Sequence, residues 1–66
     1  MLFEIMNAKQ LLEILKEDGW YLKAQAGSHR QFVHPIKSGK VTVSYQGKDE
    51  IPKGTLNSIL KQAGLK

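Results

Sequence analysis

The chain has 66 residues and no cysteine, and its ten lysines and arginines exceed its six acidic residues, which gives a formal net charge of +4. The lack of cysteine excludes a disulfide framework and a thiolate metal site and points to the cytoplasm, while no apolar run approaches the roughly 18 residues that cross a bilayer. So short a chain forms one domain, which we expect to span residues 1–66 with a core from about 7 to 65, and its charge favours nucleic acid or an acidic protein as partner.

The opening segment, residues 1–6, is apolar but has no positively charged start and carries an acid at Glu4. A signal peptide needs a cationic start and a longer apolar core. We therefore interpret this segment as a strand-like or loosely docked lead-in.

A first helix is predicted to begin after Asn7 and to end at Gly19. The Asn7 side chain can cap the first amides while Gln10 reaches back, as in a weak capping box. One helical face is apolar and consists of Ala8, Leu11, Leu12 and Leu15. Gly19 tolerates the left-handed conformation that ends many helices, and Trp20 follows as the apolar residue that closes such a cap.

The apolar period changes to two between Trp20 and Tyr45, which predicts three antiparallel strands. Turn signals separate them at Gly27-Ser28 and at residues 37–39. One face of the first strand is expected to carry Trp20, Leu22, Ala24 and Ala26, and the third strand carries Val41 and Val43. Residues 46–51 form a polar loop.

The first hairpin has two possible registers. A two-residue turn at Gly27-Ser28 places His29 and Val33 on the face of Leu22, whereas a three-residue turn places Phe32 there. We favour the three-residue turn, because it buries the larger ring and leaves His29 exposed at the turn.

A second helix opens around Pro52 and ends at Gly64, with Leu65 folding back on its last turn. Its apolar stripe consists of Leu56, Ile59, Leu60 and Ala63. Because each helix has one apolar stripe to bury, both should cover the same sheet face. The predicted fold class is α+β with the order α-β-β-β-α, like a double-stranded-RNA-binding domain: a three-stranded antiparallel sheet with two helices on one face.

The segment between Trp20 and Lys48 contains no carboxylate. It holds both histidines and the cations Lys23, Arg30, Lys37, Lys40 and Lys48, which we interpret as a continuous electropositive module. A basic, solvated surface without a binding role is the alternative interpretation.

His29 is the first candidate for chemistry, since histidine both takes and gives a proton near neutral pH. RNA carries its own nucleophile, the 2′-hydroxyl, and its cleavage needs proton removal, proton donation and cationic stabilisation of the phosphorane. His29 suits either proton step, and Arg30 and nearby lysines suit the third task. DNA lacks the hydroxyl, and the chain has no carboxylate cluster for the divalent metal that DNA cleavage would need.

His34 is the second candidate, but residues 29 and 34 of a regular strand point to opposite faces. We therefore interpret His34 as strand-end structure and expect no two-histidine metal site. Trp20 and Phe32 are expected in the core, while Tyr21 and Tyr45 are open to either packing or base stacking.

Several short motifs together resemble a known family. They are Gly19-Trp20, Gly27-Ser28-His29 with Phe32 and His34-Pro35, Val41-Thr42-Val43, Gly47-Lys48, residues 52–56 and residues 59–65. The chain resembles, from about Asn7 to Leu65, the HicA toxins of type II toxin–antitoxin systems, also described as YcfA-like messenger-RNA interferases.

The resemblance implies a double-stranded-RNA-binding-like fold, cleavage of mRNA by a single histidine that matches His29, no metal or organic cofactor, and inhibition by a HicB-type antitoxin that covers the active face. The lack of a long apolar run separately predicts no membrane association. We expect the toxin alone to be a monomer that enters a higher-order complex with the antitoxin. The residues expected to bind RNA are Ser28, Arg30, Lys23, Lys40 and Lys48.

The chain departs from the family pattern at three places. Ala24 and Ala26 stand where many members have basic residues, and Val43-Ser44-Tyr45-Gln46 stands where relatives commonly read Val-Pro-x-His. The leading segment, residues 1–6, is also a few residues longer than the family pattern. Two other functions therefore stay open: a non-catalytic RNA-binding module, and an interaction domain whose basic face docks an acidic protein.

Overall fold

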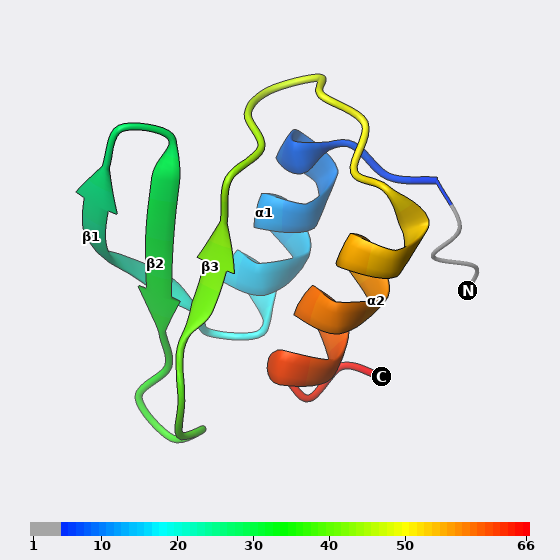
Figure 1. Cartoon of the computed structure of the whole chain (residues 1–66). Helices are drawn as coiled ribbons and strands as arrows, with labels where there is room; N and C mark the ends of the chain where they lie inside the picture. The colour runs from blue at the N-terminus through cyan, green and yellow to red at the C-terminus, as the bar shows by residue number, and fades with distance from the viewer. Residues whose placement is uncertain (1–4) are drawn as a thin grey trace.

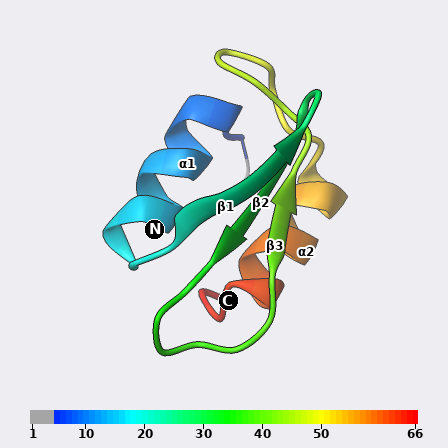
Figure 2. The same ribbon diagram turned by 90° about the vertical axis from the view of Figure 1, so that its left-hand side faces the viewer.

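Two helices cover one face of a three-stranded antiparallel sheet (Figure 1). The computed structural model describes residues 5–66. Its elements are α1 (Ala8–Glu17), β1 (Tyr21–Ala26), β2 (His29–Val33), β3 (Val41–Val43) and α2 (Lys53–Gln62), with the strands in the order β1-β2-β3. The strands lie in front of both helices in Figure 2. The predicted α+β fold, like a double-stranded-RNA-binding domain, is confirmed.

The ends of α1 follow the capping chemistry that the sequence predicts. The Gln10 backbone N–H donates to Asn7 Oδ1 at 2.8 Å, and the Asn7 backbone N–H donates to Gln10 Oε1 at 3.0 Å. These two bonds complete the capping box. At the other end Gly19 has a φ of 105° and the Trp20 amide donates to the Leu15 carbonyl at 2.9 Å. These bonds fix where the chain enters and leaves α1.

The core lies between the two helices and the sheet. Most of its fully buried residues come from the predicted stripes of both helices and from β3: Ala8, Leu11, Leu15, Leu56, Leu60, Ala63, Val41 and Val43. Ile51, at the end of the loop predicted as polar, is also fully buried. Trp20 is 3% exposed, and Phe32 and Tyr45 are partly buried against the core. Pro52 lies just before the first residue of α2, and the Leu65 amide folds back to the Leu60 carbonyl at 2.8 Å.

Of the predicted lead-in, residues 1–6, the structure describes residues 5 and 6, and Met6 packs against the domain. Met6 is buried, and its carbonyl accepts from the Ile51 amide at 2.9 Å. Asn7 forms an isolated antiparallel bridge with Glu50. The rest of the predicted lead-in, residues 1–4, lies outside the described residues.

The β1–β2 hairpin corrects the predicted turn. Ala26 pairs with His29, so the turn has two residues and the favoured three-residue turn is wrong. The pairing shifts between Leu22 and Ala24, where Lys23 forms a bulge, and Leu22 then lies opposite Phe32. A two-residue turn alone would place Phe32 and Leu22 on opposite faces of the sheet. The extra residue at the bulge reverses this, so Phe32 lies on the same face as Leu22.

The bulge also divides β1 between the two faces of the sheet. Directly paired residues share a face, so Ala24 and Ala26 lie with His29 on the face that the helices leave open. Leu22 lies on the helix-facing side with Phe32. The predicted single face of Trp20, Leu22, Ala24 and Ala26 is therefore interrupted at Lys23.

Neither helix of residues 5–66 has the length and apolar character that a membrane span requires.

Candidate functional site

His29 begins the central strand β2 and is exposed on the open face of the sheet. Its partner on β1 is Ala26, whose methyl group leaves space beside the imidazole. On the other side Ser44 follows β3, and its Oγ lies 3.2 Å from His29 Nδ1. Within residues 5–66 the imidazole Nε2 has no hydrogen-bond partner, so this atom is free to exchange a proton with a ligand.

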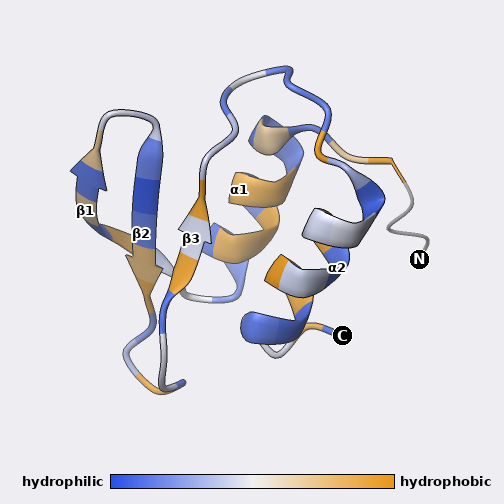
Figure 3. Ribbon diagram, in the orientation of Figure 1, coloured by the Kyte–Doolittle hydropathy of each residue, from blue (hydrophilic) through white to orange (hydrophobic). Residues whose placement is uncertain are grey.

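A small hollow adjoins the imidazole. It has a volume of about 110 Å³ and is lined by Ala24, Gln25, Ala26, His29 and Gln31. The first half of β2 is strongly hydrophilic (Figure 3). The open face of the sheet thus combines polar side chains with the small side chains of Ala24 and Ala26. An RNA strand could approach such a surface closely.

Arg30 lies on the opposite side of the sheet from His29. It pairs with the buried Val43, and consecutive residues of a strand point to opposite faces. Its Nη2 donates to the Tyr45 carbonyl at 2.9 Å, and its Nε is buried without a partner among the described residues. The structure therefore does not bring the Arg30 guanidinium beside His29.

The other predicted RNA-binding residues are exposed but scattered. Ser28 lies in the turn next to His29, and Lys23 lies at the β1 bulge. Lys48 lies in the loop that follows β3, whereas Lys40 precedes β3 and thus lies at the opposite end of the sheet from Ser44. The cations do not form the continuous electropositive module that the sequence suggests.

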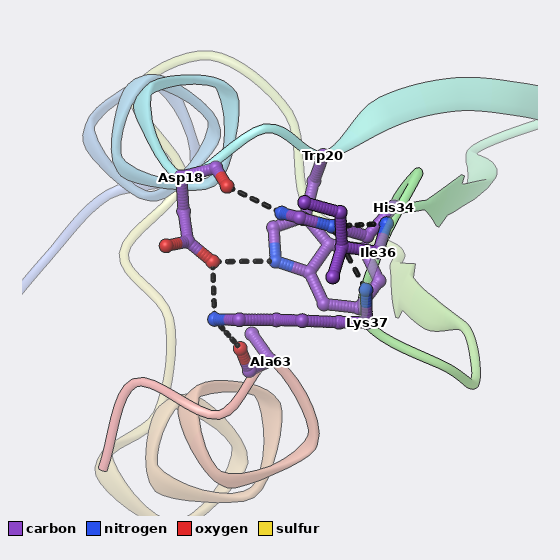
Figure 4. Close-up of polar contacts among 6 residues, drawn as sticks. All are labelled: Asp18, Trp20, His34, Ile36, Lys37 and Ala63. Atoms are coloured by element: carbon purple, nitrogen blue, oxygen red, sulfur yellow. Dashed lines mark hydrogen bonds and ion pairs between the residues drawn. The ribbon is translucent and has the colours of Figure 1, made fainter.

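His34 is a structural residue, as predicted (Figure 4). Its Nδ1 accepts from the Ile36 and Lys37 amides, both at 3.0 Å. Nε2 must therefore carry the ring proton, and it donates to the Asp18 carbonyl at 2.5 Å. The ring also meets Trp20 edge to face, with centroids 5.2 Å apart. Both ring nitrogens are occupied, so His34 is not a second proton-transfer group for His29.

Lys37 extends the same network to both helices (Figure 4). Its Nζ lies 2.6 Å from Asp18 Oδ2 and 2.9 Å from the Ala63 carbonyl. The Trp20 indole also donates to Asp18 Oδ2, at 3.1 Å. The hydrogen bond from Lys37, helped by its charge and by the indole, lowers the pKa of the Asp18 carboxyl below its usual value. Lys37 therefore links the two helices to the loop after β2. The sequence analysis had grouped it with the cations of the electropositive module.

A larger hollow lies away from His29, between α1 and the helix-facing side of β1 and β2. It has a volume of about 350 Å³ and is lined mainly by Leu12, Trp20, Leu22 and Phe32, with the cations Lys16 and Arg30. The predicted shared face of Leu22 and Phe32 is confirmed, but the space between these side chains and α1 depends on tertiary packing, so sequence reasoning missed the hollow. Residues 5–66 contain no group of three or more metal-ligating side chains.

A comparison with family models finds a match over most of this chain. The model described as the HicA toxin of bacterial toxin–antitoxin systems matches residues 8–65. No curated protein matches the chain. Since the family match covers nearly all of the 66 residues, the chain belongs to the HicA toxin family.

Proposed function

We propose that this toxin is a metal-independent endoribonuclease that cleaves mRNA with His29 and is neutralised by a HicB-type antitoxin. Family membership supports the toxin role. The observation that carries the nuclease proposal is the His29 imidazole, which is exposed on the open sheet face with Nε2 free of partners within residues 5–66.

The reaction needs no group beyond the chain and the RNA. His29 Nε2 takes the proton of a 2′-hydroxyl, and the 2′-oxygen attacks the adjacent phosphorus. The bond from phosphorus to the 5′-oxygen breaks, and that oxygen takes the proton from the His29 imidazolium, which leaves a 2′,3′-cyclic phosphate, a 5′-hydroxyl and the neutral imidazole. A positioned acid or base contributes a factor of about 10²–10⁴ to such a step.

The RNA is expected to cross the open face next to the β1–β2 turn. Ser28, Lys23, Lys40 and Lys48 are exposed and are proposed to contact phosphates. Arg30 also remains a proposed contributor, but its guanidinium binds the Tyr45 carbonyl on the other side of the sheet. Its effect on phosphate binding should therefore be weaker than that of an exposed lysine on the RNA path.

The antitoxin is proposed to act by covering the same face. A HicB-type protein seated over His29 and the adjoining hollow would exclude RNA from the free Nε2. The toxin released from this partner is expected to be a monomer, which is supported by a buried core built from Met6 to Ala63 of the same chain.

The decisive experiment expresses the wild type, His29→Ala and His34→Gln under a tight promoter and follows growth and total RNA. His29→Ala should fold normally and lose at least about 100-fold in cleavage, as expected for a group that transfers the proton. His34→Gln is the matched histidine control and should keep cleavage at a temperature where it is folded.

Two results would favour the other functions. RNA binding that falls steeply with salt, without cleavage by any variant, indicates a non-catalytic RNA-binding module. Co-purification with a small acidic partner, with neither RNA binding nor cleavage by the released chain, indicates a docking domain. Equal growth arrest by His29→Ala and the wild type would contradict the proposed mechanism.

A further inference from the structure

Ser44 is the one cross-strand neighbour of His29 that offers a hydrogen bond. Arg30 pairs with Val43, so the register places Ser44 directly across from His29 on the open face. The neighbour on the β1 side is Ala26, which has no polar side-chain atom. The 3.2 Å contact between Ser44 Oγ and His29 Nδ1 is therefore the only side-chain hydrogen bond that holds the imidazole within residues 5–66.

The direction of this bond decides which ring nitrogen faces the substrate as a base. If the Ser44 hydroxyl donates to Nδ1, the neutral ring carries its proton on Nε2, and Nε2 has no lone pair with which to accept another. If the hydroxyl accepts from Nδ1–H, the free Nε2 has the lone pair that a general base needs. The second arrangement alone suits removal of a 2′-hydroxyl proton.

The accepting arrangement also persists after proton transfer. The imidazolium keeps its Nδ1–H, so the hydroxyl continues to accept while Nε2–H becomes available to the leaving oxygen. A hydrogen bond from a charged donor is stronger than one from a neutral donor. An accepting Ser44 therefore stabilises the state that forms when His29 takes the proton, without having to reorient during the cycle.

We propose that Ser44 is a positioning residue, whose hydroxyl accepts from His29 Nδ1–H and so presents Nε2 to the RNA. The catalytic part of this role rests on the proposed function, cleavage of RNA by His29. The hydrogen bond itself has consequences for the imidazole that are measurable without RNA.

His34 supplies an internal reference for that measurement. The two amides that donate to its Nδ1 require the proton on Nε2. The two histidines of the folded chain should therefore show opposite neutral tautomers, Nδ1–H for His29 and Nε2–H for His34. Ring nitrogen shifts in an NMR spectrum of the labelled chain distinguish these forms, and His29→Ala assigns the signals.

The first test compares Ser44→Ala with Ser58→Ala. Ser58 is exposed on α2 and matches the substitution without touching the open sheet face. Ser44→Ala should return His29 to a mixture of tautomers and leave His34 unchanged, whereas Ser58→Ala should change neither ring. An Nε2–H tautomer of His29 in the wild type, or a His29 spectrum that Ser44→Ala does not alter, overturns the proposal.

The second test follows cleavage of a short RNA by the purified chains. Ser44→Ala should lower kcat about 10-fold, which is less than the factor of about 10²–10⁴ that the proton-transfer group itself contributes, and should change KM by less than about twofold. Ser44→Thr keeps a hydroxyl on Cβ and should recover kcat to within about threefold of the wild type. Ser58→Ala should match the wild type in both constants.

The outcomes separate the two proposals. If His29→Ala abolishes cleavage while Ser44→Ala cleaves as well as Ser58→Ala, the role of Ser44 is overturned and the proposed function stands. If His29→Ala cleaves as well as the wild type, the proposed function is overturned, and the catalytic role of Ser44 falls with it.

Discussion

Lys37 and Asp18 form an ion pair of 2.6 Å that joins the β2–β3 loop to the end of α1. Because the Lys37 ammonium also donates to the Ala63 carbonyl, the same side chain reaches the end of α2. Three segments that are distant in the sequence thus meet at one cation. Stability at this end of the molecule should depend on the charge of Asp18.

Acidification should therefore weaken the fold through Asp18. The pKa of Asp18 is lowered in the folded chain by the hydrogen bond from Lys37. Its stabilising contribution is complete above the unfolded pKa of about 4 and is lost as the pH falls through the folded value. Asp18→Asn should lower the melting temperature at pH 7 and show a smaller further loss in acid than the wild type.

Glu13→Gln is the control for this pH series, because Glu13 is exposed on α1 and its carboxylate forms no ion pair within residues 5–66. Its melting curves should follow those of the wild type at each pH. Identical pH profiles for Asp18→Asn and the wild type would contradict the assigned role of Asp18.

Gly19→Ala should destabilise the protein by about 1–3 kcal/mol, the range for backbone strain of this kind. A Cβ at Gly19 would lie 2.7 Å from His34 Nε2, and the φ of 105° disfavours any L side chain. Gly54→Ala is the matched control: Gly54 lies in α2 with no atom within 4 Å of an added Cβ. Urea unfolding should show a gain of about 0.5–1 kcal/mol for Gly54→Ala. Equal effects would show that the contact with His34 does not matter.

Leu60→Ala should cost about 2–5 kcal/mol of unfolding free energy, because Leu60 is fully buried between the helices and the sheet. Leu22→Ala should cost less than about 1 kcal/mol, since Leu22 is 47% exposed at the edge of the sheet. Urea titrations with a common slope would measure both. A larger loss for Leu22→Ala would mean that the hollow beside α1 contributes more to the fold than its exposure indicates.

Lys48→Ala should reduce the salt dependence of RNA binding. Each phosphate contact to single-stranded RNA contributes about 0.7 to the slope of log affinity against log salt. His29→Ala as the parent chain prevents cleavage during the titration, and Lys61→Ala on α2 is the matched control. The slope should fall by about 0.7 for Lys48→Ala and stay constant for Lys61→Ala. Equal slopes for the two variants would remove Lys48 from the proposed interface.

The sequence carried enough local information to predict the helices and the fold. The capping pair of Asn7 and Gln10, the apolar stripes and the glycine after each helix act over a few residues, so spacing alone revealed them. The valines of β3 were equally clear, because their alternation matches the two faces of a strand.

The site was harder to predict, because the number of residues in the β1–β2 turn and in the bulge decides which side chains share a face of the sheet. One extra residue, Lys23, moves the side chains of Tyr21 and Leu22 to the opposite faces from those that a regular strand would give them. No composition signal marks that bulge, so the relation of Leu22 to Ala24 and Ala26 was missed. Arg30 was assigned to the His29 site because it is adjacent in sequence, yet adjacency along a strand separates two side chains. Lys37 and Asp18 are 19 residues apart, and only the tertiary fold brings them together.

The bulge at Lys23 has a consequence for the behaviour of the free toxin. β1 is an edge strand, and edge strands with unbroken ladders are templates on which other chains add strands and aggregate. A bulge in the middle of that edge, with a lysine at its apex, interrupts the regular hydrogen-bonding repeat and adds charge. Both features disfavour the addition of a strand from another molecule along the β1 edge.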